Sequence, residues 1–247
     1  MFTGIIQATA EIVSVHDHDG IRTFEIEFPE GFCHELNIGA SVSVDGVCLT
    51  ATELVSDTVV KFDVILQSLL ITTLGKHEVG GKVNVERAAK DGAEIGGHPL
   101  SGHVDFRTDI IDISELEGNC RIHFELPKKW QKYIFSKGYI AINGASLTVS
   151  DVSKEKGYFE VWLIPETRRM TTFEAKKVGA SVNIEIERGT QVVVDTIQTT
   201  LEENLGKLYP LLEQLLEAKG IDLNALTTSK LALGQDLKSE DEHTPRE

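Results

Sequence analysis

Short runs in which apolar and polar residues alternate dominate the first 190 residues of the chain. A period of two is typical of a β-strand that buries one face, so these runs predict strands. The predicted strands are residues 40–44, 48–55, 59–65 and 82–87 in the first half, and residues 139–142, 147–152, 158–164 and 181–186 in the second. Residues 3–6 and 101–104 are expected to add a first strand to each half. The pattern therefore predicts an all-β fold over most of the chain.

Two short turns stand between neighbouring predicted strands, at Asp45-Gly46 and at Asn143-Gly144. Asp, Asn and Gly tolerate the positive φ angles that two-residue hairpins require, so both pairs predict tight hairpins. Residues 127–135 start with a proline and are expected to form a short helix, with residues 29–36 at the matching place in the first half.

The pattern occurs twice along the chain. Residues 44–50 (VDGVCLT) return as 142–148 (INGASLT), residues 3–6 (TGII) as 101–104 (SGHV), residues 72–74 (TTL) as 171–173 (TTF), and residues 83–86 (VNVE) as 182–185 (VNIE). The offset is 98 for the first two pairs and 99 for the last two. A period near 100 is too long for a solenoid repeat, so the chain contains two copies of one small domain.

The copies differ at two reactive positions, where Cys48 corresponds to Ser146 and Ile5 corresponds to His103. Such a difference suits a protein that holds two similar ligands and treats them differently. Some six short strands in each copy of about 95 residues fit a small closed barrel better than a sandwich.

The character of the chain changes after residue 195, where apolar residues recur at helical spacing: Ile197, Leu201, Leu205, Leu208, Leu212 and Leu215. Pro210 is expected to kink or split this helix, and Gly220 is expected to end it. The apolar stripe could pack on the chain's own barrels or against another subunit, and we favour association. The predicted domains are barrel 1 at residues 1–97, barrel 2 at 98–190, a helical oligomerisation segment at 191–234 and a disordered acidic tail at 235–247.

Composition excludes several classes of function. The net charge is −15, from 24 basic and 39 acidic residues, and no basic cluster stands out, so nucleic acid is not an expected partner. Three scattered cysteines form no disulfide framework and no zinc spacing, which favours a cytoplasmic protein with reduced thiols. The N-terminus lacks the features of a signal peptide, and no run approaches the length of a membrane span.

Three segments of each copy are expected to converge on a ligand. They are residues 3–6 or 101–104, the Gly-x-x-Leu-Thr turn, and the strand that ends near residue 65 or 164. Gly4 and Gly102 let a ligand approach the backbone closely, and Thr50, Ser146 and Thr148 add hydroxyl groups. Seen once, the motif would indicate only a turn and a strand start. Its duplication favours a binding site.

His103 is a candidate acid or base because the ordinary pKa of histidine lies near neutrality, although a histidine on a strand is more often structural. A metal site at His98 and His103 is a weaker hypothesis, since residues five apart face opposite sides of a strand and no third ligand is near in sequence. Cys48 could be a nucleophile or a small buried residue. The pairs Thr72-Thr73 and Thr171-Thr172 are interpreted as strand fillers.

Six motifs carry a resemblance to a known family: residues 1–5 (MFTGI), 46–50 (GVCLT), 96–105 (GGHPLSGHVD), 137–139 (KGY), 143–148 (NGASLT) and 164–167 (IPET). Together they resemble riboflavin synthase of the alpha-chain type, which has tandem lumazine-binding domains. The resemblance runs from Met1 to about Thr200. It implies two six-stranded Greek-key barrels, a homotrimer held by C-terminal helices, and a site between the first barrel of one subunit and the second barrel of another.

The resemblance also implies the reaction. Two molecules of 6,7-dimethyl-8-ribityllumazine dismutate, and one gives a four-carbon unit to the other, which yields riboflavin and 5-amino-6-ribitylaminouracil. Two identical substrates suit a duplicated domain, and the acidic C7 methyl group of the lumazine needs only orientation and proton transfer. No metal or other cofactor is expected. Association with lumazine synthase is a possible further partnership.

Carried over residue by residue, the resemblance assigns two substrate sites. The first comprises Gly4, Ile5, Ile6, Cys48, Leu49, Thr50, Asp63, Val64, Ile65, Leu66, Gln67 and Ser68. The second comprises Gly102, His103, Val104, Ser146, Leu147, Thr148, Ile164, Pro165, Glu166, Thr167, Arg168 and Arg169, with Lys137 from a neighbouring subunit. The catalytic candidates are His103, Cys48 and Ser146.

One departure concerns the first site, where the family commonly has Lys-Glu-Thr and this chain has Leu66-Gln67-Ser68. An alternative is a non-catalytic lumazine- or flavin-binding protein of the kind found in luminous bacteria, and a third is a structural trimer without ligand. In the binding proteins the second site has typically degenerated. Here the segments around His98, His103 and Ser146 are intact, which favours the enzyme.

Overall fold

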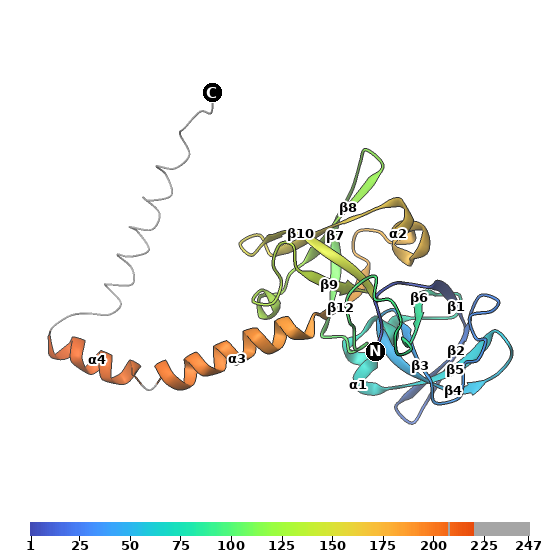
Figure 1. Ribbon diagram of the computed structural model, residues 1–247, viewed down its shortest axis with the longest axis horizontal. Helices are drawn as coiled ribbons and strands as arrows, with labels where there is room; N and C mark the ends of the chain where they lie inside the picture. The colour runs from blue at the N-terminus through green and yellow to red at the C-terminus, as the bar shows by residue number, and fades with distance from the viewer. Residues whose placement is uncertain (207, 220–247) are drawn as a thin grey trace. The chain divides into compact units, whose positions relative to one another are not determined.

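The computed structural model describes residues 1–206 and 208–219, and residues 1–192 form one compact unit that contains two closed barrels (Figure 1). The strands of barrel 1 are β1 (Ala8–His18), β2 (Ile21–Glu27), β3 (Ser41–Val44), β4 (Val47–Leu54), β5 (Val59–Ile65) and β6 (Lys82–Arg87). Those of barrel 2 are β7 (Phe106–Leu116), β8 (Asn119–Glu125), β9 (Tyr139–Ile142), β10 (Ala145–Ser153), β11 (Tyr158–Leu163) and β12 (Ser181–Ile186).

Both barrels have the same topology. Barrel 1 has the order β1-β2-β5-β4-β3-β6, and barrel 2 has the equivalent cyclic order β7-β8-β11-β10-β9-β12, with all neighbours antiparallel. The predicted all-β fold with two duplicated six-stranded barrels is therefore confirmed. The eight strands predicted from alternation are all present, with ends that differ from the prediction by at most two residues.

Two predictions of regular elements were wrong. Residues 3–6 and 101–104 are irregular segments and not strands. Gly4 and Gly102 adopt positive φ angles, and their backbone N–H groups donate to carboxylates and not to the carbonyl groups of a neighbouring strand. The helix expected at residues 127–135 is only a 3₁₀ turn, η2 (Lys128–Trp130), since no run of apolar residues there is long enough to bury a helix face. The predicted strand ends near residues 65 and 164 are confirmed, and each strand leads into a helix that was not predicted, α1 (Leu66–Ile71) or α2 (Pro165–Met170).

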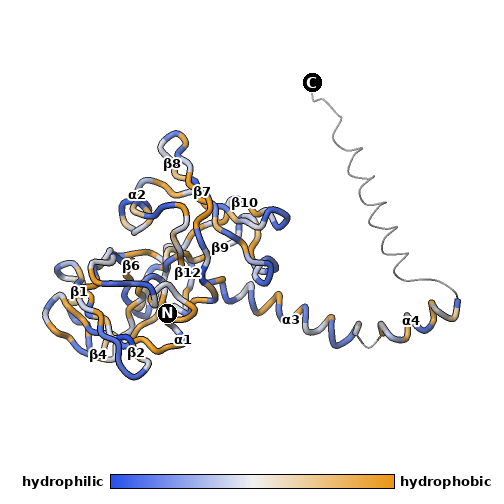
Figure 2. Tube along the Cα trace, turned by 180° about the vertical axis from the view of Figure 1, so that it is seen from behind, coloured by the Kyte–Doolittle hydropathy of each residue, from blue (hydrophilic) through white to orange (hydrophobic). Residues whose placement is uncertain are grey.

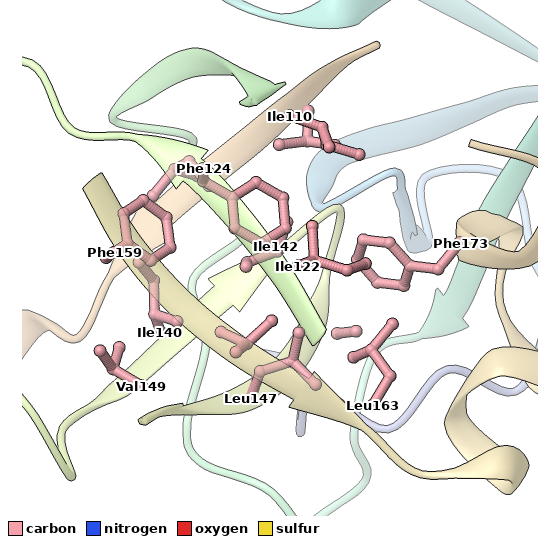
Figure 3. Close-up of a cluster of buried hydrophobic side chains, with 14 of the residues drawn as sticks. Ile110, Ile122, Phe124, Ile140, Ile142, Leu147, Val149, Phe159, Leu163 and Phe173 are labelled. Carbon is pink, nitrogen blue, oxygen red and sulfur yellow. The ribbon is translucent and has the colours of Figure 1, made fainter. Parts of the chain in front are cut away.

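Each barrel encloses its own apolar core, which explains the alternation in the sequence. Along β5 the side chains of Val60, Phe62 and Val64 are buried while the residues between them face outward. Figure 3 shows the core of barrel 2, where Phe124 and Phe159 lie among aliphatic side chains from neighbouring strands. Each strand therefore has one inward face in the core and one outward face available for function.

The predicted hairpins are confirmed, and they meet each other. Asp45 and Gly46 have φ angles of 45° and 80°, and Asn143 and Gly144 have 46° and 79°, as a type I′ turn requires. A Cβ atom on Gly46 would lie 2.7 Å from the backbone nitrogen of Gly144. Glycine at both positions therefore allows the two turns to touch at the junction of the barrels.

Buried amide side chains join the barrels reciprocally. Asn183 accepts a hydrogen bond from the backbone N–H of Thr73 at 2.7 Å, and Asn84 accepts one from the N–H of Thr172 at 2.7 Å. The same two amides donate to the carbonyl oxygens of Asp45 and Asn143 in the opposite turns. The threonine pairs are thus not strand fillers: they begin the 3₁₀ helices η1 (Thr73–Lys76) and η3 (Thr172–Ala175) and contact the other barrel.

Residues 193–219 belong to a second unit, which is helical. The helix α3 (Arg188–Leu205) is followed by α4 (Tyr209–Ala218). Pro210 is the second residue of α4, where a backbone N–H would have no acceptor within the helix, so its absence costs no hydrogen bond. The predicted split is therefore confirmed. Apolar residues recur along both helices (Figure 2), and Ile197, Leu201, Leu208 and Leu215 are at least half exposed. The predicted stop at Gly220 and the tail at residues 235–247 lie outside the described residues.

Candidate functional site

The outward side of β4 and β5 forms the first face, which we define by Cys48, Thr50, Asp63 and Ile65. Ala51 of β4 pairs with Phe62 of β5. The adjacent residues on the side of the Asp45-Gly46 turn, Thr50 and Asp63, therefore lie beside each other on the outer surface. Ile65 is 58% exposed, whereas Leu49 and Val64 are buried in the core. Of the strand residues predicted for the first site, only the alternate ones can offer a side chain to a ligand.

The second face is the equivalent surface on barrel 2, defined by Ser146, Thr148, Trp162 and Ile164. Val149 of β10 pairs with Val161 of β11, and both are buried. The adjacent residues Thr148 and Trp162 therefore lie beside each other on the outer surface. Leu147 is buried in the core of barrel 2 and does not reach the surface. The two faces therefore have the same construction from the same strands of each repeat.

The segments 3–6 and 101–104 lie against the turn of the opposite repeat. The N–H of Ser146 donates to the carbonyl oxygen of Gly4 at 2.8 Å, and the N–H of Cys48 donates to that of Gly102 at 2.8 Å. An antiparallel bridge between Phe2 and Leu100 ties the two segments together. This pairing differs from the predicted grouping, which placed Gly4 with Cys48 and Gly102 with Ser146. The first face thus adjoins His103, and the second face adjoins Ile5.

Glycine is required at both crossing points. Gly4 and Gly102 have φ angles of +77° and +78°, and a Cβ atom on either would lie 2.6 Å from the Cβ of Ser146 or Cys48. Ile5 and His103 follow these glycines and are exposed, whereas Ile6 and Val104 are buried in the cores. Only the residue directly after each glycine presents its side chain to the surface.

A buried glutamate fixes each segment. The carboxylate of Glu86 accepts from the N–H and hydroxyl of Thr3 at 2.6 and 2.7 Å and from the N–H of Gly4 at 3.0 Å. Glu185 binds Ser101 and Gly102 in the same way, at 2.7, 2.7 and 3.0 Å. Burial raises the pKa of the Glu86 carboxyl, and the hydrogen bonds from Thr3 and Gly4 oppose that shift. The repeated Val-Asn-x-Glu motif thus supplies both the junction amide and the clamp for the segment.

His98 orients the hydroxyl group of Ser146. Its Nδ1 atom lies 2.6 Å from Ser146 Oγ, and its ring stacks on Tyr139 with 5.2 Å between centroids. The side chain is 3% exposed, and burial lowers the pKa of His98, so the imidazole is neutral near pH 7.

The remaining predicted residues lie near the ends of the faces. Leu66, Gln67 and Ser68 begin α1, and Pro165, Glu166, Thr167, Arg168 and Arg169 begin α2. Arg168 binds Glu174 and Glu115 at 2.6 and 2.9 Å, and Arg169 binds Glu166 at 2.7 Å. Lys137 is exposed, with its backbone N–H bound to the carbonyl of Val149. In the part of the chain that the structure describes, no three His, Cys, Asp or Glu side chains form a metal-binding group.

Sequence reasoning missed two residues of the second face. His98 was considered as a metal ligand and as part of the motif at residues 96–105, and its distance from Ser146 along the chain gave no signal of their contact. Trp162 was overlooked because the second site was taken to begin at Ile164. Its correspondence to Asp63 at the offset of 99 residues could have revealed it.

Comparisons with known proteins agree with the duplicated fold. The lumazine-binding domain model matches residues 3–88 and again residues 101–187. Riboflavin synthase of Escherichia coli strain K12 is 46% identical over 202 residues, which cover 81% of this chain and 93% of that protein. Riboflavin synthase of Chlamydia pneumoniae is 42% identical over 201 residues, which cover 81% of this chain and 97% of that protein.

Among solved structures, LumP complexed with riboflavin matches with a TM-score of 0.70 and 28% identity, covering 76% of this chain and all of that chain. LumP complexed with 6,7-dimethyl-8-(1'-D-ribityl) lumazine matches with a TM-score of 0.68 and 27% identity, covering 76% of this chain and 99% of that chain. The family model and the riboflavin synthases each span most of both repeats. The chain belongs to the riboflavin synthase family, with two lumazine-binding domains in tandem.

Proposed function

We propose that the chain makes riboflavin from two molecules of 6,7-dimethyl-8-ribityllumazine, one held on each outer face. The observation that carries this proposal is the duplicated face, built from equivalent strands and completed by a clamped glycine segment from the other repeat. A reaction between two copies of one molecule needs two similar sites. One lumazine gives a four-carbon unit to the other, and the products are riboflavin and 5-amino-6-ribitylaminouracil.

The two faces offer different proton chemistry. His103 stands beside Cys48 on the first face, exposed and able to exchange protons with a bound ligand. On the second face the equivalent position is Ile5, and the polar group is the hydroxyl of Ser146 that His98 orients. His103 therefore takes or returns a proton at the C7 methyl group of the lumazine, while Cys48 and Ser146 orient or polarise the rings. Backbone N–H and C=O groups at the strand edges bind the amide-like edge of each ring.

The two lumazines must meet, and we infer that they do so between the first barrel of one subunit and the second barrel of another. Exposed apolar residues support association. Ile65, Leu66 and Leu70 are each more than half exposed beside the first face, and Ile197 and Leu201 are exposed on α3. A homotrimer held by the C-terminal helices would cover the helical residues. Lys137 would then enter the site from a neighbouring subunit.

Truncation after Asp195 tests this assembly. Removal of most of α3 and all of α4 is expected to lower the oligomeric state in sedimentation and to reduce turnover sharply. Deletion of residues 235–247 alone is the matched control and is expected to change little. An intact trimer after the long truncation would contradict the role of the helices.

Two further proposals concern the cellular setting. The free thiols of Cys33, Cys48 and Cys120 support a cytoplasmic location, where thiols stay reduced. Lumazine synthase is a candidate partner because it would deliver the substrate directly. Among the residues that the structure describes, no helix is long and apolar enough to cross a membrane.

Incubation of the pure protein with 6,7-dimethyl-8-ribityllumazine tests the function. We expect riboflavin absorbance to rise without added cofactor and to continue in the presence of a chelator. Tight binding without turnover would instead identify a lumazine- or flavin-binding protein. That second candidate is favoured by the LumP likeness.

A further inference from the structure

The two faces also differ at a position that lies outside the four repeated motifs. Asp63 of the first face corresponds to Trp162 of the second. The carboxylate of Asp63 accepts a hydrogen bond from the hydroxyl of Thr23 at 2.6 Å. Trp162 remains 38% exposed, next to Ile164, which is 58% exposed. The second face therefore has an aromatic and apolar surface where the first face has a charge.

A polar network fixes the indole of Trp162. Its Nε1–H donates to Glu160 at 2.7 Å, and the same carboxylate accepts from the hydroxyl of Ser150 at 2.7 Å and contacts His123 Nε2 at 2.8 Å. The side chain of Glu160 is only 13% exposed. The indole is thus held in place before any ligand arrives, which lowers the entropy that binding must lose.

Barrel 1 cannot hold an indole in the same way. The residue that corresponds to Glu160 is Lys61, whose ammonium group binds Glu53 at 2.6 Å and lies 3.8 Å from Glu25. A lysine has no acceptor for an indole N–H. The charge at this position is therefore reversed between the repeats, and the support for Trp162 exists only on the second face.

We propose that Trp162 is a ligand-binding residue of the second face, whose exposed indole packs against the flat heterocycle of the bound lumazine or riboflavin. The inference rests on the proposed function for the identity of the ligand. Aromatic side chains stack on planar heterocycles through dispersion and quadrupole interactions and tolerate differences in ring substituents. The second face thus binds through the ring, and an aspartate in the equivalent place gives the first face no such surface.

Binding of riboflavin to the full-length chain tests the proposal by calorimetry. Trp162→Ala is expected to weaken one class of sites about tenfold or more and to leave the other unchanged, since stacking on one aromatic side chain is worth about 1–3 kcal/mol. Trp162→Phe keeps an aromatic face and is expected to restore most of the affinity. Trp162→Leu keeps an apolar side chain without that face and serves if the alanine variant does not fold.

The chain has one other tryptophan, Trp130, which stacks on Phe106 at 4.9 Å and provides the matched control. Trp130→Phe is expected to leave both classes of sites within twofold of the wild type. If Trp162→Ala and Trp162→Leu both fold and bind riboflavin at both sites within twofold of the wild type, Trp162 has no such role. Riboflavin formation by the wild-type protein is measured in parallel. A wild type that binds riboflavin through Trp162 but makes none would contradict the proposed function and not this inference.

Discussion

The two barrels agree closely where they meet and differ where they face outward. At the junction Asn84 and Asn183, like Glu86 and Glu185, make equivalent hydrogen bonds at nearly equal distances. On or beside the outer faces three pairs of corresponding residues are chemically unlike: Cys48 and Ser146, Asp63 and Trp162, His103 and Ile5. Buried hydrogen-bonded groups are costly to change because a lost partner leaves a polar atom unsatisfied. The outer faces carry no such constraint and can specialise.

One junction position breaks the agreement. Asp45 is fully buried, and its second carboxylate oxygen lies 3.2 Å from Nε2 of His77. In the other repeat the residue that corresponds to His77 is Lys176, and among the described residues no hydrogen bond from the side-chain nitrogen of Asn143 is found. A buried carboxylate needs a donor, and His77 supplies it. Where barrel 1 has an aspartate in place of the asparagine of barrel 2, it thus also has a histidine that binds the buried carboxylate.

The largest effect on turnover is expected at His103, which is proposed to transfer protons on the first face and has no equivalent on the second. His103→Ala is expected to lower turnover by about 10²- to 10⁴-fold while lumazine binding changes little, because proton transfer acts mainly on the reaction barrier. Ile5→Ala changes the corresponding residue on the second face and is the control, with a loss of less than about tenfold. Steady-state kinetics with a parallel binding titration measures both. Equal losses in the two variants would contradict the assignment.

The next prediction concerns the crossing of the segments. Gly102→Ala is expected to destabilise the protein by about 2–4 kcal/mol, since its Cβ would lie 2.6 Å from that of Cys48 and its φ angle is +78°. Gly80→Ala has a φ angle of +84° with open space around it and isolates the backbone cost, about 1–2 kcal/mol. Urea unfolding measures both. If the two variants lose equal stability, the segment does not lie against the Cys48 turn as described.

A smaller effect is expected from pH, through His98. Burial lowers the pKa of His98 in the folded state below its ordinary value of 6.5, so the unfolded chain binds a proton that the folded chain resists. Stability is therefore expected to fall as the pH drops below about 6.5, by at most about 1.4 kcal/mol per pH unit. His98→Gln should flatten this part of the profile. A wild-type urea midpoint that stays constant between pH 7.5 and 5.5 would argue against a buried neutral imidazole.

The smallest effect is expected at Cys48. Cys48→Ser introduces the hydroxyl that the other repeat already has at Ser146, so turnover is expected to stay within about tenfold of the wild type if Cys48 orients or polarises the ligand. Complete loss of turnover in a variant that still folds and binds lumazine would indicate a covalent thiolate mechanism. Product formation over time, corrected for the background rate, distinguishes these outcomes.

The sequence predicts the barrels well because strand alternation and duplication are local or directly comparable signals. It misplaces residues 3–6 and 101–104, since the carboxylates that bind them are more than 80 residues distant in the chain. The same limit applies to the site. Its residues were assigned by motif, but their grouping into faces was not predicted, because the crossing of Gly4 to Ser146 and Gly102 to Cys48 is a long-range contact.

Strand alternation also contains information on the site that motif matching does not use. Leu49, Val64 and Leu147 belong to the two assigned substrate sites, yet each alternates with an outward residue and lies in a core. Trp162 belongs to no motif but alternates outward on β11. The direction in which a side chain points was thus predictable from the period of two, whereas the hydrogen bond between His98 and Ser146 was not.

The central claim is that the two faces each hold one lumazine and that the pair reacts. The most direct measurement follows the loss of 6,7-dimethyl-8-ribityllumazine and the appearance of riboflavin in one sample of the pure full-length protein. The account predicts one riboflavin and one 5-amino-6-ribitylaminouracil for every two lumazines consumed. Saturable lumazine binding with no riboflavin above the uncatalysed background would contradict it.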